Sequence, residues 1–244
     1  NSLEGILHHA TTDRIMDILQ KGSSQKNEGR KDGRANNELR PMKVEQAILE
    51  RADGSARLSQ GKSSVLVAVH GPMEVKQRKE LIDKSTLEVI YKPKSGIAGP
   101  KEKELEFTLR STIENVVMTA LHPRTAITIT VQVLTEDGSM FSTALNAICL
   151  ALEDAGIPMK DQVASCTCAV TKDGQLLIDP TEAEETNSHS QLVFAFNSAQ
   201  DGIVTSKSIG TFTEESYFLA LEASKKACEK IFTFFRSTTQ TKYQ

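Results

Sequence analysis

The chain has 244 residues, a length that suits one sizeable domain or a domain with a tail. Its formal net charge is −3, with 39% hydrophobic and 25% charged residues, as in a globular protein. A weakly acidic chain does not attract nucleic acid as a whole, so any RNA contact must come from a local basic patch. Tryptophan is absent and aromatic residues are 5%, which argues against extensive base stacking.

The cysteine spacing excludes a zinc site of the paired-cysteine type. We expect Cys149, Cys166, Cys168 and Cys228 to be reduced thiols of an intracellular protein. No apolar run is long enough to span a bilayer, and the amino terminus lacks the apolar core of a signal peptide. We therefore expect a soluble protein without a membrane partner.

The order of predicted elements indicates an α+β fold. Residues 1–30 are predicted to be an appendage and linker, with a short helix capped by Thr12 or Asp13, ahead of a domain at 31–244. The predicted strands are 44–49, 56–58, 64–69, 87–91, 125–133, 163–170, 176–178, 192–196 and 203–209. The predicted helices are 101–121, 142–155 and 214–235, the last with Phe218, Leu221, Ala227 and Ile231 facing inward. A hairpin start, a strand-helix-strand-helix core and a closing helix predict mixed sheets packed with helices.

A loop rich in arginine and asparagine precedes the first strand. It reads Asp32-Gly33-Arg34-Ala35-Asn36-Asn37-Glu38-Leu39-Arg40-Pro41, and Gly54-Ser55 follow in the next hairpin. Arg34 and Arg40 carry planar donor forks that suit phosphate. This order resembles the amino-terminal signature of the RNase PH family, and the resemblance extends over roughly residues 32–236 in the order of strands and helices. The resemblance implies an RNase PH-like fold; the alternative for the loop is a solvated basic turn.

Residues 137–144 are similar to the loop and helix start where RNase PH relatives bind inorganic phosphate. The resemblance implies phosphate-binding roles for Ser139, Ser142 and Thr143. Active relatives carry a Thr-Arg pair where this chain has Met140 and Phe141. Neutral donors bind anions less strongly than a guanidinium does, so we expect phosphorolysis to be weak or absent. The alternative is a plain helix N-cap.

Two carboxylates lie six residues apart after a predicted strand, at Asp179 and Glu185. In active relatives the matching carboxylates are catalytic, so the resemblance implies that this pair holds Mg²⁺ and supplies a general acid. An acidic turn that enters a helix is the competing interpretation, because carboxylates favour a helix amino terminus.

Basic residues are spread over three parts of the chain. The resemblance and the charge pattern together nominate seven RNA contacts, namely Arg34, Arg40, Lys76, Gln77, Arg78, Arg110 and Arg124. Only Arg110 falls where the helix of active relatives carries an arginine. The alternative is that the run around Lys76 is a solvated charged surface.

The departures from active relatives resemble the eukaryotic exosome branch of the RNase PH family. That branch implies an RNA-contacting core subunit of a 3′–5′ complex for rRNA processing and RNA decay, in the nucleus, nucleolus and cytoplasm. The implied partners are single-stranded RNA and other RNase PH-like subunits, with no required cofactor. Strands 87–91 and 125–133 suggest exposed edges, so we expect the isolated chain to be a homodimer.

Two alternative functions stay open. The first is an active homodimeric nuclease, either a phosphate-dependent 3′–5′ exoribonuclease that uses inorganic phosphate or a hydrolytic enzyme that uses Mg²⁺. The second is an assembly module without RNA contact.

Overall fold

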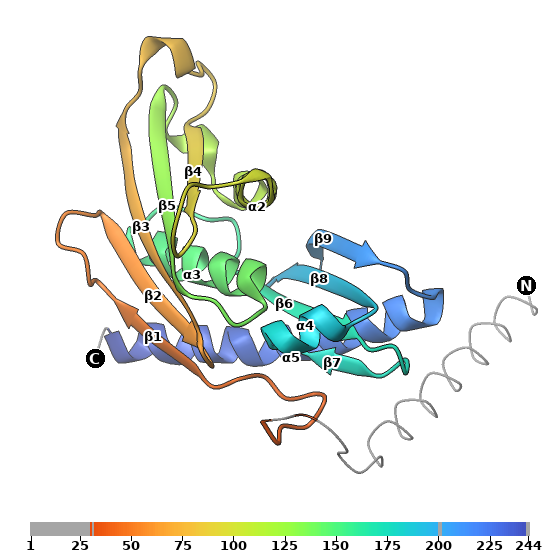
Figure 1. Cartoon of the computed structure of the whole chain (residues 1–244). Helices are drawn as coiled ribbons and strands as arrows, with labels where there is room; N and C mark the ends of the chain where they lie inside the picture. The colour runs from red at the N-terminus through yellow and green to blue at the C-terminus, as the bar shows by residue number, and fades with distance from the viewer. Residues whose placement is uncertain (1–29, 31, 200–201, 243–244) are drawn as a thin grey trace, which may run out of the picture. The chain divides into compact units, whose positions relative to one another are not determined.

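The computed structural model describes residues 30, 32–199 and 202–242, and the predicted helix after Thr12 or Asp13 lies outside them. The chain divides into a unit of residues 1–36 and a unit of residues 37–244. The elements below all belong to the second unit (Figure 1). Within the described residues, no helix combines the length and the apolar character needed to cross a membrane.

The first sheet has five strands in the order β1-β2-β3-β5-β4. Its strands are β1 Met42–Gln46, β2 Gly54–Gln60, β3 Ser63–Glu74, β4 Thr86–Lys92 and β5 Thr125–Thr135. All neighbours are antiparallel except β4 and β5, which run parallel. Gly61 makes the tight β2–β3 turn, where its φ of 61° suits a residue without a Cβ atom. Since β5 lies between β3 and β4, the prediction of an exposed edge at 125–133 was wrong, and β4 alone forms that edge.

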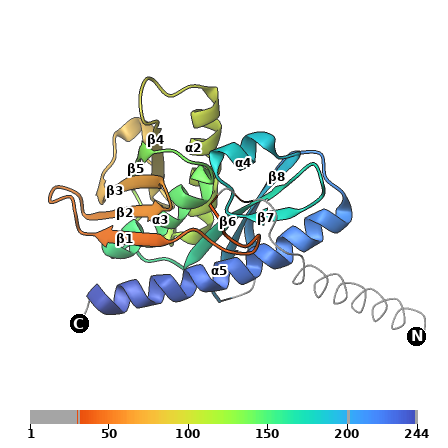
Figure 2. The same cartoon turned by 60° about the horizontal axis from the view of Figure 1, so that its bottom comes forward.

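The second sheet has four strands in the order β7-β6-β8-β9. Its strands are β6 Val163–Val170, β7 Leu176–Ile178, β8 Ser190–Asn197 and β9 Ile203–Gly210. Every residue of β6 is buried, because helices cover both faces of the sheet at this strand (Figure 2). Among the described residues, β9 pairs only with β8, so its other edge has no partner strand there. The fold is thus the expected α+β arrangement of mixed sheets and helices.

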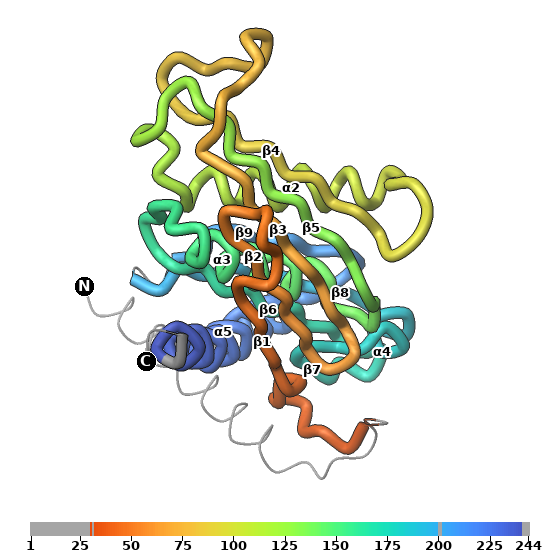
Figure 3. The backbone as a smooth tube through the Cα atoms, turned by 90° about the vertical axis from the view of Figure 1, so that its left-hand side faces the viewer, coloured from red at the N-terminus to blue at the C-terminus, as the bar shows by residue number. Residues whose placement is uncertain are grey.

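Within the described residues, four α-helices accompany the sheets, α2 Pro100–Val116, α3 Met140–Asp154, α4 Glu182–Asn187 and α5 Glu214–Lys242. Two short 3₁₀ turns are η1 Gln77–Lys79 and η2 Thr119–Leu121. α3 is buried from Met140 to Leu152, because it contacts β2 and β3 on one side and β6 on the other. α5 packs on β6, β7 and β8, and Figure 3 looks nearly along its axis. A helix that is buried on all sides over most of its length therefore forms the centre of this unit.

Several element boundaries differ from the sequence prediction. The first strand ends at Gln46, because Ala47 adopts a left-handed backbone with a φ of 55°. The predicted helix 101–121 ends at Val116, because Val117 is extended and bridges to Met159. The last helix continues past residue 235 to Lys242.

The inward face predicted for α5 is only partly correct. Ala227 and Ile231 are buried as predicted. Leu221 is half-buried, and Phe218 is 51% exposed. Phe218 lies near the start of α5 and contacts Tyr217, so its ring belongs to a surface aromatic cluster rather than to the core.

Gly54 allows β2 to approach the carboxyl end of α3. A Cβ atom at Gly54 would lie 2.5 Å from the Ala151 carbonyl oxygen and 2.6 Å from the Ala155 Cβ. Gly54→Ala should therefore lower the free energy of unfolding by about 1–3 kcal/mol, as overpacking does, measured by urea unfolding. Gly99→Ala is the matched control, because the added methyl meets only the flexible Glu102 side chain. Equal losses in both variants would contradict this account.

Candidate functional site

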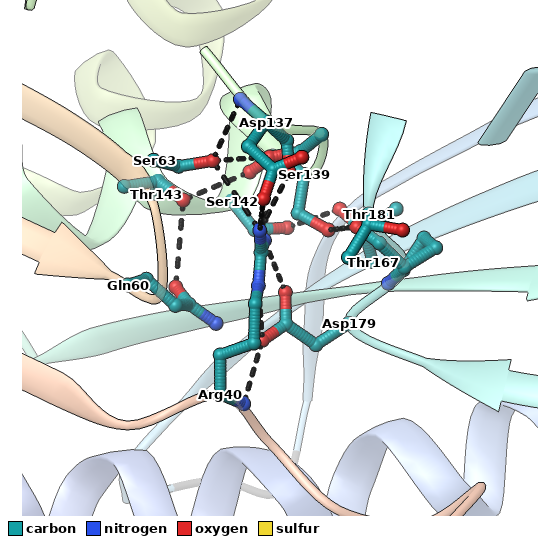
Figure 4. A network of polar contacts seen from close by, with 12 residues as sticks. Arg40, Gln60, Ser63, Asp137, Ser139, Ser142, Thr143, Thr167, Asp179 and Thr181 are labelled. Atoms are coloured by element: carbon teal, nitrogen blue, oxygen red, sulfur yellow. Dashed lines mark hydrogen bonds and ion pairs between the residues drawn. The ribbon is translucent and has the colours of Figure 1, made fainter. Parts of the chain in front are cut away.

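A buried ion pair between Arg40 and Asp179 forms the centre of the candidate site (Figure 4). Arg40 Nη2 donates to Asp179 Oδ1 at 2.6 Å, and Nε donates to Oδ2 at 3.0 Å. The Arg40 backbone N–H adds a third bond to Oδ2 at 2.9 Å. Side-chain exposures of 4% for Arg40 and 1% for Asp179 show that the pair is removed from water. This two-pronged geometry is the strongest form of arginine–carboxylate contact.

The rest of the Arg40 guanidinium holds the loop that leads into α3. Nη1 donates to the Asp137 carbonyl at 2.6 Å, and Nη2 donates to the Gly138 carbonyl at 3.3 Å. Ser63, at the start of β3, donates to the same Gly138 carbonyl at 2.9 Å. Arg40 thus joins the segment before β1, the β3 start, the loop before α3 and the end of β7. Its donors face protein acceptors, which argues against the predicted RNA contact at Arg40.

Asp179 is held as an ionised acceptor. Burial alone would raise its pKa, but the hydrogen bonds and charge of Arg40 outweigh burial, and the pKa lies below its ordinary value. A carboxylate in this state accepts hydrogen bonds and does not donate a proton near neutral pH. The arrangement favours a structural role for Asp179 over the predicted catalytic role.

Glu185 from α4 lies against the start of α3. Its Oε1 accepts a hydrogen bond from the Ser139 backbone N–H at 2.6 Å. Burial raises the pKa of the Glu185 carboxyl, while the Ser139 N–H and the charge of Arg40 oppose the shift. The negative charge of Asp179 also acts on Glu185, so the structure brings the two predicted carboxylates to one site. Of the two, Glu185 has the raised pKa that a general acid needs.

The three predicted phosphate donors are buried and bonded within the protein. The Ser139 hydroxyl donates to the Pro180 carbonyl at 3.0 Å, and the Thr143 hydroxyl donates to the Ser139 carbonyl at 3.0 Å. The Ser142 hydroxyl lies 2.7 Å from the Thr167 hydroxyl. These contacts fasten α3 to its neighbours, and they leave the hydroxyl groups poorly placed for a bound anion.

Phe141 points into the core, with 6% of its side chain exposed. Active relatives carry an arginine at this position by the resemblance described above. An arginine introduced here would bring a charge into a buried position, which is costly unless a carboxylate pairs with it.

The candidate site does not fit a magnesium ion. Mg²⁺ needs near-octahedral oxygen ligands that commonly include one or two carboxylates. Both Asp179 oxygens already accept hydrogen bonds from Arg40. Among the residues described, no three His, Cys, Asp or Glu side chains converge as a metal site.

The remaining predicted RNA contacts fall into three places. Lys76, Gln77 and Arg78 lie in and beside η1 and are exposed. Arg124 joins them at this end of the first sheet, because its backbone N–H donates to the Leu81 carbonyl. Arg110 is exposed on α2, a separate element.

Arg34 belongs to the unit of residues 1–36, and its Nε lies 2.6 Å from Asp32 Oδ2. That pairing lies within its own unit. It gives Arg34 a local role in the loop.

The Arg40–Asp179 pair leads to a prediction about stability. Asp179→Asn removes the charge and leaves a buried guanidinium without its carboxylate. Breaking a buried pair costs about 3–5 kcal/mol, so the free energy of unfolding should fall by that amount in urea titrations. Asp173→Asn, in the exposed β6–β7 turn, is the control and should change little. A loss below about 1 kcal/mol would contradict the buried pairing.

The same pair predicts how stability changes with pH. The folded-state pKa of Asp179 lies below its unfolded value of about 3.9, so the pair stabilises the fold above that pH. This stabilisation is lost as the pH falls through the folded-state value. Unfolding measured from pH 7 to pH 3 should therefore show a steeper acid-side loss in the unmodified chain than in Asp179→Asn. Parallel curves would show that Asp179 keeps an ordinary pKa.

Comparison with known proteins agrees with the fold. The chain matches the 3′ exoribonuclease family, domain 1, over residues 38–158 and domain 2 over residues 161–227. It is 37% identical over 229 residues to a rice (Oryza sativa subsp. japonica) protein named exosome complex exonuclease RRP46 homolog, covering 87% of this chain and 96% of the relative. It is 36% identical over 228 residues to the exosome complex component Rrp41 of Archaeoglobus fulgidus, covering 88% and 87%.

Solved structures show the same architecture. The crystal structure of rice Rrp46 matches with a TM-score of 0.83 at 39% identity, over 86% of this chain and all of that one. An archaeal exosome core chain matches with a TM-score of 0.74 at 20% identity, over 96% of this chain and 99% of that one, and shows the fold alone. The expected kinship is confirmed: this chain belongs to the RNase PH, or 3′ exoribonuclease, family.

Proposed function

We propose that this chain is an RNA-contacting core subunit of an exosome-type complex for 3′–5′ RNA processing and decay. One observation carries the proposal. Asp179, which stands where active relatives carry a catalytic carboxylate, is held in a buried ion pair by Arg40, while the basic residues at η1 are exposed. Relatives named as exosome components, with coverage near the full length of both chains, support it. For this role we propose a location in the nucleus, nucleolus and cytoplasm.

The structural role follows from how the site uses its polar groups. Asp179 is bound by Arg40, and the hydroxyl groups predicted to bind phosphate are bonded to the protein. The position that carries arginine in active relatives is the buried Phe141. Catalysis commonly depends most on donors and cations that stabilise charge in the transition state, and few such groups are available here.

A catalytic function remains the second candidate, favoured by Glu185. Its raised pKa suits protonation of a leaving group. The test is incubation of the purified chain with labelled single-stranded RNA, with and without phosphate and Mg²⁺. We expect no phosphate-dependent release of nucleoside diphosphates. Release that needs phosphate and disappears in Glu185→Gln would establish the enzyme and overturn the structural assignment.

RNA contact through η1 should be electrostatic. Lys76 and Arg78 are exposed, and no ion pair engages them within the part of the chain that the structure describes. Nearby, Lys79 is held by Glu88 at 2.9 Å and Arg124 by Glu80 at 3.6 Å. Lys76 and Arg78 are thus the cations at this end most available to backbone phosphates. Such contacts position RNA without reading its sequence.

The variant Lys76→Glu with Arg78→Glu tests this contact. Affinity for single-stranded RNA should fall for all sequences alike, and the salt dependence of binding should become shallower by roughly 0.7 per lost phosphate contact. Fluorescence anisotropy at several salt concentrations measures both quantities. The control is Lys172→Glu with Lys230→Glu, an equal charge change at exposed sites on other elements. Equal effects on RNA affinity in both variants would show that binding depends on net charge alone and not on a contact at η1.

Assembly with other RNase PH-like subunits should use the open edge of β9. On the edge of β4, the Tyr91 N–H already donates to Glu106 from α2. β9 instead exposes Ile203 at 47% and Ile209 at 52% along an edge that no strand in the described part of the chain covers. Unprotected edges of this kind pair with other chains. We therefore propose β9 as the pairing edge in a homodimer of the isolated chain.

Light scattering at micromolar concentration tests the dimer. Ile209→Lys should shift the isolated chain to a monomer, because lysine on an edge strand opposes pairing. Ile97→Lys is the control, since Ile97 is 98% exposed in the loop before α2. A strict monomer before any substitution would refute the homodimer.

A further inference from the structure

A groove runs along the outer edge of β4, where α2 forms its second wall. Two adjoining pockets make up this β4–α2 groove, with volumes of about 440 Å³ and 380 Å³. Both pockets include Ile90, Lys103 and Glu106, so the two are continuous. Volumes of this size are typical of ligand sites, at about 300–1,000 Å³.

Cations outnumber free carboxylates in the β4–α2 groove. Its cationic side chains are Lys92, Lys94, Lys103 and Arg110. Its two carboxylates are both engaged, Glu88 by Lys79 at 2.9 Å and Glu106 by Lys103 at 3.0 Å. Among the residues that the structure describes, Lys92 and Lys94 form no ion pair. A chain of net charge −3 thus concentrates unneutralised positive charge here, which suits a polyanion.

An exposed aromatic ring lies within the same groove. Phe107 of α2 is 62% exposed, although it is a large apolar side chain. The Arg110 guanidinium carbon lies 5.5 Å from the centre of its ring. Aromatic rings and guanidinium planes are the surfaces on which unpaired bases stack. The groove therefore combines a stacking platform with cations for neighbouring phosphates.

We infer that the β4–α2 groove binds single-stranded RNA, with one base stacked on the Phe107–Arg110 platform. The phosphates on either side lie near Lys92, Lys94 and Lys103. This inference rests on the proposed RNA-contacting function and deepens it, because it adds a base contact to the phosphate contacts at η1. Stacking is tolerant of sequence, as processing of varied RNA requires.

An added peptide strand is the less suitable occupant. A strand that pairs with an open edge needs the outward N–H and C=O groups of that edge. On β4, the outward Tyr91 N–H is taken by Glu106 Oε2 at 3.2 Å. Glu106 also lines both pockets, so a peptide strand would have to displace it. RNA instead uses the side chains that the groove presents.

The experiment measures binding of the purified full chain to two probes of equal length. One probe is oligoadenylate RNA with a 2-aminopurine base, and the other is the same backbone without bases. Phe107→Ala should weaken oligoadenylate binding roughly 5- to 150-fold, the range that stacking of one base supports. It should relieve the quenching of 2-aminopurine fluorescence, leave the salt dependence unchanged, and leave binding of the abasic probe unchanged. Phe107→Trp should restore both affinity and quenching.

Controls separate this inference from the proposed function. Phe218→Ala removes an aromatic ring of similar exposure, 51%, outside the groove and should have no effect. The double variant at Lys76 and Arg78 should weaken both probes, whereas Phe107→Ala affects only the probe with bases. If Phe107→Ala binds oligoadenylate as well as the unmodified chain does, the groove is not an RNA site. Loss of binding only in the η1 variant would leave the RNA function intact and overturn the groove.

Discussion

The buried pair of Arg40 and Asp179 is the contact on which the two halves of this fold depend. It links the segment before the first sheet to the end of β7 in the second sheet, and it also holds the loop that starts α3. Two charges this deeply buried are tolerable only because nearly every donor and acceptor is satisfied. The pair therefore specifies the geometry of the site more than it adds to stability.

The central position of α3 has consequences for the chemistry of the site. Both sheets pack on this helix, so its first residues are buried and its hydroxyl groups bond to neighbouring elements. Glu185 then supplies a carboxylate at the helix start, at Ser139. A helix start that exposes its donors can receive an anion, but one enclosed in this way is occupied by the protein's own groups.

The polar groups at the centre of this chain have a different role from the cations at its surface. The centre is satisfied internally, and available charge lies outside, at η1 and in the β4–α2 groove. Lys79 and Arg124 are engaged in ion pairs, so Lys76 and Arg78 are the cations at η1 that are more available to RNA phosphates. This division suits the proposed role of a subunit that guides RNA within an assembly, because local cations can contact RNA although the chain has a net negative charge.

The sequence by itself determined the family and most elements, because hydrophobic periodicity and turn residues are local signals. The bounds of strand β6 and helix α3 were predicted closely. The ends of β1 and α2 were not, because they depend on the backbone conformations of Ala47 and Val117, which the local sequence does not determine. The sequence could not show that β5 lies inside its sheet or that β9 is an edge strand, since strand order is set by long-range pairing. It also paired Asp179 with Glu185 by spacing but missed Arg40 and Ser63 as their neighbours in the site. Only the tertiary structure decided that Asp179 serves Arg40 and that Phe107 is exposed, because burial and hydrogen-bond partners arise when distant segments pack together.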